Sequence, residues 1–134
     1  MSNLENIEIP DTVKNYGEKI LLMCLYLKNA KLSKSFTVIN SGTFSQCKRL
    51  INVSFPENLV EIQTMAFWEC NALQYFKLPE TLENIGEQAF QSCNEFINVE
   101  IPEKITYLSR SIFSTCINLK QITFPQNLYY IEEN

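Results

Sequence analysis

The sequence predicts a solenoid, in which short repeated units stack on one another around a parallel β-sheet. Three columns of residues recur in one frame of 23 residues. Cysteine occupies the first column, at Cys24, Cys47, Cys70, Cys93 and Cys116. Proline occupies the second, at Pro10, Pro56, Pro79, Pro102 and Pro125, with Ser33 as the exception. Leucine opens the units at Leu4, Leu27, Leu50, Leu73 and Leu119, with Phe96 in its place once. Three independent columns with one period indicate stacked units.

The repeat makes the chain one domain, residues 1–134, with units that begin at residues 4, 27, 50, 73, 96 and 119. Five units are full, and the sixth is incomplete. A unit of this length cannot bury its own apolar side. A stack can, because like side chains pack on like side chains from one unit to the next.

Each unit opens with a short strand. Positions 4 and 6 of the unit are apolar and flank a variable residue, which is the two-residue period of a strand with one buried side. In the third unit the inward residues are Val53 and Phe55, with Ser54 pointing outward. Pro56 then ends the strand, because proline has no amide hydrogen for the ladder.

The rest of the unit returns the chain to the next strand. A second extended piece, such as TLENI at residues 81–85, places Leu82 and Ile85 inward. The following GEQAFQSC, residues 86–93, has Ala89, Phe90 and Cys93 on one side, which predicts about one helical turn. Two glycines, Gly17 and Gly86, share position 14, where we expect a positive φ.

Residues 73–96, LQYFKLPETLENIGEQAFQSCNEF, resemble the BspA-like class of leucine-rich repeat, whose unit has the form LxxIxLPxxLxxIGxxAFxxCxxL. The likeness covers essentially the whole chain, with departures at Leu21, Ala30 and Ser33. It implies a right-handed, curved leucine-rich repeat solenoid, with the parallel β-sheet on the concave face and short extended and helical-turn segments on the convex side. It also implies an adhesion or protein-binding module, of the kind found on bacterial surfaces and in protists.

The cysteine column is the first candidate for chemistry. A metal site, a disulfide and a nucleophile are the functional alternatives, but stacked sulfurs form a line and do not converge on one point. The chain has no histidine to activate a thiol. We therefore expect buried structural cysteines, with no metal, no cofactor and no enzymatic activity.

The outward strand positions are the candidate protein-binding residues of the concave face: Asn29, Lys31, Asn52, Ser54, Tyr75, Lys77, Asn98 and Glu100. Two interpretations of the asparagine column stay open, namely a ladder of hydrogen bonds along the stack and a contact surface for a partner. Tyr75 interrupts the column near its middle, and tyrosine is enriched in protein hot spots. The favoured function is a non-catalytic protein–protein interaction module whose protein ligand binds this sheet.

A self-associating structural or cell-surface adhesion element is the alternative function. The first unit carries four apolar residues that the repeat does not require: Leu22, Met23, Leu25 and Tyr26. In the last unit, residues 119–124 form an edge, and unpaired edges favour association. These features predict a homo-oligomer that assembles through its uncapped terminal repeats.

Charge and composition restrict the remaining partners and the location. Eleven basic and fifteen acidic side chains give a net charge of −4 without a basic cluster, which argues against nucleic acid. The longest apolar run, residues 20–27, is too short for a membrane helix, so we expect no membrane insertion. Free cysteines and a start without a secretory signal favour an intracellular, cytoplasmic location. The family resemblance instead suggests the cell surface, where Asn52, in the sequence NVS, would be a glycosylation acceptor.

Overall fold

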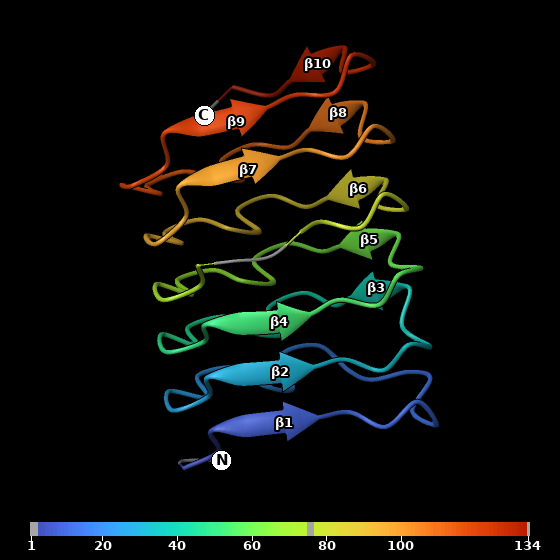
Figure 1. The fold of residues 1–134 in the computed structure, drawn as a ribbon, viewed down its shortest axis with the longest axis vertical. Coiled ribbons are helices and arrows are strands. Elements are labelled where there is room, and N and C mark those ends of the chain that lie inside the picture. The colour runs from blue at the N-terminus through green and yellow to red at the C-terminus, as the bar shows by residue number, and fades with distance from the viewer. Residues whose placement is uncertain (1–2, 75–76, 134) are drawn as a thin grey trace.

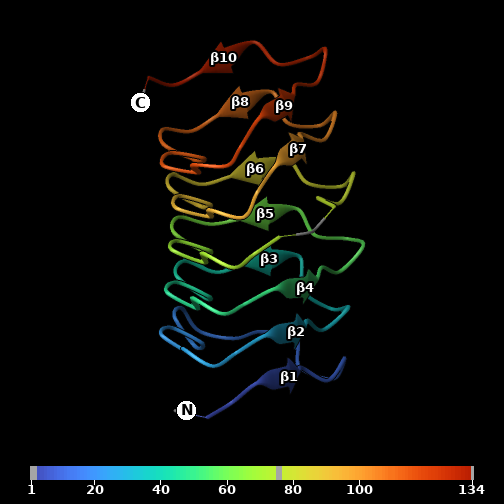
Figure 2. The ribbon, with the colours of Figure 1, turned by 60° about the vertical axis from the view of Figure 1, so that its left-hand side comes forward.

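The computed structural model describes residues 3–74 and 77–133. The chain winds into a parallel-strand β-solenoid of about five turns, which confirms the predicted fold class. Its coils follow one another from the N-terminus at one end of the stack to the C-terminus at the other (Figure 1). The strands of the described residues lie on two faces of the stack, which Figure 2 shows from a second side.

The first face is formed by three-residue strands that coincide with the strands predicted at the unit starts. They are β1 (Asn6–Glu8), β2 (Asn29–Lys31), β4 (Asn52–Ser54), β7 (Asn98–Glu100) and β9 (Gln121–Thr123). All pairs are parallel, in the orders β1-β2-β4 and β7-β9. The register places each residue opposite its equivalent one unit away, as in Ala30 opposite Val53. The sequence period therefore fixes the register of this face.

The second face is formed by two-residue strands after the proline corner. They are β3 (Val38–Ile39), β5 (Glu61–Ile62), β6 (Asn84–Ile85), β8 (Tyr107–Leu108) and β10 (Tyr130–Ile131). These strands pair in parallel in the orders β3-β5-β6 and β8-β10. Ile39, Ile62 and Ile85 point inward and are buried. Burial of Leu82 and Ile85 confirms the predicted second extended piece.

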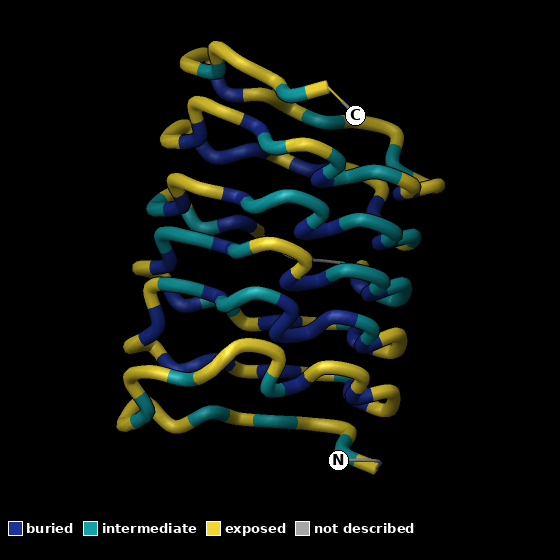
Figure 3. Tube along the Cα trace, turned by 180° about the vertical axis from the view of Figure 1, so that it is seen from behind, coloured by how far each residue is buried: buried dark blue, intermediate teal, exposed yellow. Residues whose placement is uncertain are grey.

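The core is a stack of like side chains. The rings of Phe44, Phe67 and Phe90 are fully buried and lie parallel, with centroids 5.1 and 5.2 Å apart. The ring of Phe113 continues the stack at 5.8 Å and is partly exposed. All five cysteines are free and buried beside this stack. Seen from behind, the first and last coils are more exposed than the central ones (Figure 3).

The proline column makes the corner between the two faces. The carbonyl of Pro56 accepts a hydrogen bond from the amide of Leu59 at 3.2 Å, and the other prolines repeat this turn. In the second unit Ser33 stands in place of proline and forms the same turn, in which the Phe36 amide donates to the Ser33 carbonyl. It is buried, its hydroxyl donates to the Val13 carbonyl at 2.9 Å, and the same oxygen accepts from the Ser35 amide at 3.1 Å.

The segment that returns the chain to the first face consists of consecutive hydrogen-bonded turns, where the sequence predicts about one helical turn. Two residues per unit have a positive φ, and they form two columns along the stack: Lys19, Gly42, Met65, Gln88 and Ser111; and Met23, Gln46, Glu69, Ser92 and Thr115. Within each unit the two left-handed residues lie four positions apart, and at each of them an α-helix cannot continue. The amides of this segment bond to the next coil, as Phe44 N does to Ala66 O at 2.8 Å.

The expected positive φ at Gly17 and Gly86 is wrong, since Gly42 is the glycine with that conformation. Gly86 is required for a different reason. A Cβ added to it would lie 2.5 Å from the Thr64 backbone nitrogen and 2.8 Å from the Gln63 carbonyl carbon. Coils therefore approach one another too closely at this point for any side chain. Gly17 has nothing within 4 Å of an added Cβ.

Candidate functional site

The first face carries the predicted binding residues on the outward positions of its strands. In β2, β4 and β7 the middle residue is buried and the two flanking residues are exposed. This places Asn29, Lys31, Asn52, Ser54, Asn98 and Glu100 on one side of the molecule. Tyr75 lies outside the described residues. The face is not uniform, because two hollows of different chemistry lie on it.

The N-terminal hollow lies over strands β1, β2 and β4 and has a volume of about 420 Å³. Four of the predicted binding residues line it: Asn29, Lys31, Asn52 and Ser54. The amide Nδ2 of Asn29 donates to Asn6 Oδ1 at 2.7 Å, and that of Asn52 donates to Asn29 Oδ1 at 3.0 Å. The structure therefore shows the asparagine ladder, one of the two interpretations of this column, between these three residues.

The charged groups of this hollow also bond to each other. Lys31 Nζ lies 2.6 Å from Glu8 Oε1, and this hydrogen bond, with the charge of the carboxylate, raises the pKa of Lys31. Since the amides and the ion pair satisfy one another, a ligand would have to displace these contacts. The N-terminal hollow is therefore better described as a hydrogen-bonded part of the sheet surface than as an open recognition site.

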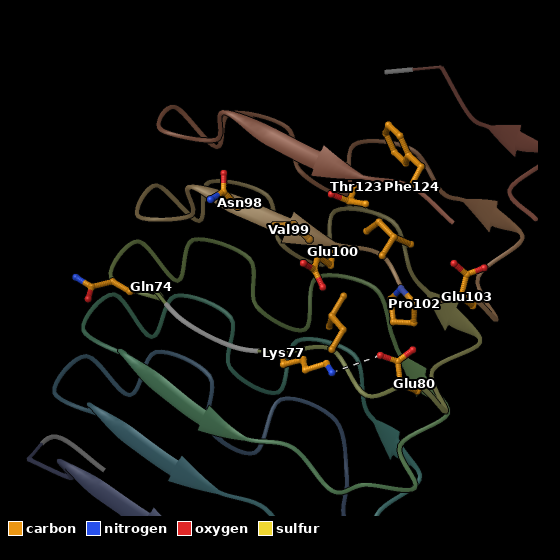
Figure 4. A pocket seen from close by; sticks show the side chains of 12 residues that line it. Gln74, Lys77, Glu80, Asn98, Val99, Glu100, Pro102, Glu103, Thr123 and Phe124 are labelled. Carbon is orange, nitrogen blue, oxygen red and sulfur yellow. Dashed lines mark ion pairs between the residues drawn. The ribbon is translucent and has the colours of Figure 1, made fainter. Parts of the chain in front are cut away.

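The C-terminal hollow lies beside β7 and β9 and has a volume of about 500 Å³, within the range of ligand sites (Figure 4). Its lining combines apolar and charged side chains: Gln74, Lys77, Leu78, Glu80, Asn98, Val99, Glu100, Ile101, Pro102, Glu103, Thr123 and Phe124. The predicted residues Lys77, Asn98 and Glu100 meet here. Phe124, an inward strand position in the repeat pattern, is 47% exposed.

Glu80 and Glu103 also belong to this site, although they are not among the binding residues predicted from the sequence. Both follow the proline corner that borders the first face, and both line the hollow. Lys77 Nζ lies 3.6 Å from Glu80 Oε1, and the dashed line in Figure 4 marks this ion pair. Glu100 and Glu103 form no ion pair within residues 3–74 and 77–133. The recurrence of glutamate one residue after proline was the available signal.

The cysteines form a row of hydrogen bonds along the stack. Sγ of Cys47, Cys70 and Cys93 donates to a carbonyl of the preceding unit at 3.1, 3.1 and 3.3 Å, and Cys116 does so at 3.1 Å. Desolvation by burial raises the pKa of Cys47 to about 12 and that of Cys116 to about 11. Thiols held in this state are poor nucleophiles. In the described part of the chain, no group of three His, Cys, Asp or Glu side chains is placed to hold a metal ion.

The four predicted self-association residues lie on the surface of the first return segment. Leu22, Met23, Leu25 and Tyr26 are between 40% and 56% exposed. The guanidinium of Arg49 lies over the Tyr26 ring, 5.0 Å from its centroid. Exposed aromatic residues also gather at β10, where Tyr129 and Tyr130 were not predicted. Over residues 3–74 and 77–133, no helix has the length and apolar character that crossing a membrane requires.

Known proteins share this architecture. The chain is similar to a leucine rich cell surface protein from Faecalibacterium prausnitzii A2-165, with 28% identity, 98% of this chain and 38% of that chain covered, and a TM-score of 0.84. It is also similar to a leucine-rich repeat protein from Bacteroides ovatus ATCC 8483, with 26% identity, 96% and 39% covered, and a TM-score of 0.71. The pneumococcal vaccine antigen PcpA shares the fold at 22% identity, with 98% and 31% covered and a TM-score of 0.80.

This chain thus spans less than two fifths of the length of each of these three proteins. No curated protein matches it. The family model described as BspA type leucine rich repeat region matches in six copies, over residues 1–94 and 51–134. Both the match and the stacked columns of the structure extend through the whole repeat array, and the chain therefore belongs to the BspA-type leucine-rich repeat family.

Proposed function

We propose that this protein is a non-catalytic interaction module that binds a protein ligand through the first face. The observation that carries the proposal is the C-terminal hollow of this face, of about 500 Å³, which is lined by charged and apolar side chains beside β7 and β9. A repeat stack offers such an extended rigid surface without ordering any loop. The match to the BspA-type leucine-rich repeat family and the likeness to a leucine rich cell surface protein support an interaction or adhesion module.

Location is part of this proposal. The similar protein of F. prausnitzii is described as a cell surface protein, which supports an extracellular role. The five free cysteines no longer argue for the cytoplasm. Each is buried in its own coil and bonded to a carbonyl or packed in the core, so these thiols stay apart in any compartment.

A comparison of two faces tests the proposal. Ser54→Arg with Thr123→Arg places two bulky charges on the first face, and Asn84→Arg with Thr106→Arg places the same charges on or beside the second face. All four positions are exposed, so both variants should fold. We expect the first pair to abolish capture of surface proteins that the wild type retains, and the second pair to preserve it. Equal capture by the first-face variant and the wild type would reject the first face as the binding surface.

Self-association through the first unit is the second candidate function. It rests on the four exposed apolar residues Leu22, Met23, Leu25 and Tyr26, which stand where later units have mostly polar residues. Contiguous exposed apolar residues of this kind favour association. Light scattering should show an oligomer for the wild type and a monomer for Leu22→Ser with Leu25→Ser. A wild type that stays monomeric at tens of micromolar would remove this candidate.

A further inference from the structure

We infer that the C-terminal hollow binds a basic peptide segment of the partner, in which an arginine or lysine stands beside an apolar residue. The inference rests on the proposed function, because it assigns a chemical class of ligand to the same face. It divides the face into two parts: the N-terminal hollow, whose polar groups bond to one another, and the C-terminal hollow, whose carboxylates are available.

The availability of the carboxylates follows from the ion pairs of the structure. Three carboxylates line the C-terminal hollow, those of Glu80, Glu100 and Glu103, against the single ammonium of Lys77. Lys77 pairs with Glu80 at 3.6 Å, and no Lys or Arg of the described chain pairs with Glu100 or Glu103. In the N-terminal hollow, by contrast, Glu8 and Lys31 neutralise each other at 2.6 Å.

The floor of the hollow fits the rest of such a segment. Leu78, Ile101 and Phe124 line it; Leu78 and Ile101 are almost fully buried, and Phe124, which is 47% exposed, offers the open apolar surface. An arginine or lysine stem can lie along apolar surface while its charged end reaches a carboxylate. A neighbouring apolar side chain would cover Phe124.

The distribution of charge along the stack favours the same partner. Residues 1–49 contain seven basic and four acidic side chains, whereas residues 50–134 contain four basic and eleven acidic ones. The C-terminal part of the molecule, which holds the hollow, therefore attracts cations over a distance, and complementary charge steers association. An acidic partner would be repelled from this half.

The experiment uses the full chain and a fluorescein-labelled synthetic peptide in which arginine alternates with leucine, both ends blocked. Fluorescence anisotropy gives the dissociation constant. We expect Glu100→Gln with Glu103→Gln to weaken binding about fivefold or more, because each removed charge is an available partner for a guanidinium. Lys77→Gln should act in the opposite direction and tighten binding, because it removes the one ammonium of the hollow. A matched peptide with glutamate in place of arginine should not bind.

A control variant separates the hollow from general charge attraction. Glu18→Gln with Glu95→Gln removes the same charge from two exposed positions on the return segments. It should leave the dissociation constant within about twofold of the wild type, since neither side chain lines the hollow and exposed charges are screened at ordinary salt. Equal weakening by the control variant, or no binding of the arginine peptide by the wild type, would overturn the inference.

Failure of this inference and failure of the proposed function give different results. If the first face binds a partner of another chemistry, Ser54→Arg with Thr123→Arg still abolishes capture, while Glu100→Gln with Glu103→Gln changes nothing. If the first face is not a binding surface at all, the arginine variant and the glutamine variant both behave as the wild type, in the capture assay and in the peptide anisotropy assay. The intrinsic fluorescence of Trp68, the only tryptophan, checks that each variant is folded.

Discussion

At the scale of single residues, the central phenylalanine should contribute most to stability. Phe67 is fully buried between the rings of Phe44 and Phe90. Phe67→Ala leaves a cavity between two rings that the coil spacing holds apart, so we expect a loss of about 3–5 kcal/mol in the free energy of unfolding. Urea unfolding followed by circular dichroism measures it. Phe113→Ala, at a partly exposed position, should cost clearly less, and equal losses would contradict the stacked core.

The two glycines at position 14 offer a matched pair. Gly86→Ala forces a Cβ against the backbone of Thr64 and Gln63, and such overpacking costs about 1–3 kcal/mol. Gly17→Ala meets no atom within 4 Å and should be neutral or stabilising by up to about 1 kcal/mol. Thermal unfolding of both variants checks the prediction. A similar loss in both variants would mean that the close approach of the coils at Gly86 is not the cause.

The buried thiols predict how stability depends on pH. Burial raises the pKa of Cys47 from its ordinary value of 9.0 to about 12, and raises the pKa values of Cys70 and Cys93 well above the ordinary value. Above pH 9 the unfolded chain releases thiol protons that the folded chain retains, so the free energy of unfolding falls as pH rises from about 9 towards 12. Urea midpoints across this range measure it. Cys47→Ala should make the free energy of unfolding fall less steeply with pH. An unchanged pH dependence would mean that other groups cause the decrease.

At the scale of elements, the strands and their register could be predicted from the sequence, but the return segment could not. Strand positions repeat because the middle residue is buried in β2, β4 and β7 and half-buried in β1 and β9, so the apolar column can be seen in the sequence. The left-handed positions carry Lys, Met, Gln, Glu, Ser, Thr and one glycine, so composition gives no signal for them. Their conformation is set by hydrogen bonds to the next coil, such as Gln46 N to Trp68 O at 2.7 Å.

The same contrast, between what the sequence period specifies and what contacts between coils specify, explains which residues of the candidate binding site could be predicted. The outward strand residues follow from the two-residue period, and the asparagine ladder from the column. The C-terminal hollow depends on residues of neighbouring coils, including Glu80 after a corner and Phe124 beside it. Whether a corner residue faces the first face or solvent depends on the direction in which the chain turns at proline, which a one-dimensional pattern does not specify.

The left-handed positions lead to a prediction about the return segment. Gln88 has a φ of 56°, a conformation that costs non-glycine residues about 1 kcal/mol. Gln88→Gly should therefore be more stable than Gln88→Ala by about 1 kcal/mol, because both lose the same side chain contacts and only glycine relieves the backbone. Chemical denaturation of the two variants gives the difference. An alanine variant as stable as the glycine variant would rule out strain at this position.

At the scale of the whole molecule, each coil contacts only its neighbours, so stability should vary along the stack. The first coil is joined to the second by ion pairs between equivalent positions, Lys28–Glu5 at 3.1 Å, Lys31–Glu8 at 2.6 Å and Lys34–Asp11 at 4.0 Å. All of these side chains are exposed, and exposed pairs contribute little individually and less at high salt. The central coils are instead held by fully buried rings.

Amide hydrogen exchange tests this difference. The amides of Phe67 and Cys70, in the central coils, should exchange most slowly, because they open only when the buried stack opens. The amides of Ile9 and Leu32, which bond to carbonyls of the following coils at the N-terminal end, should exchange faster, and salt should accelerate them further. The central amides should respond little to salt. Uniform protection and a uniform salt response would show instead that the coils unfold together, and the interaction between neighbouring coils would then exceed the local differences in burial.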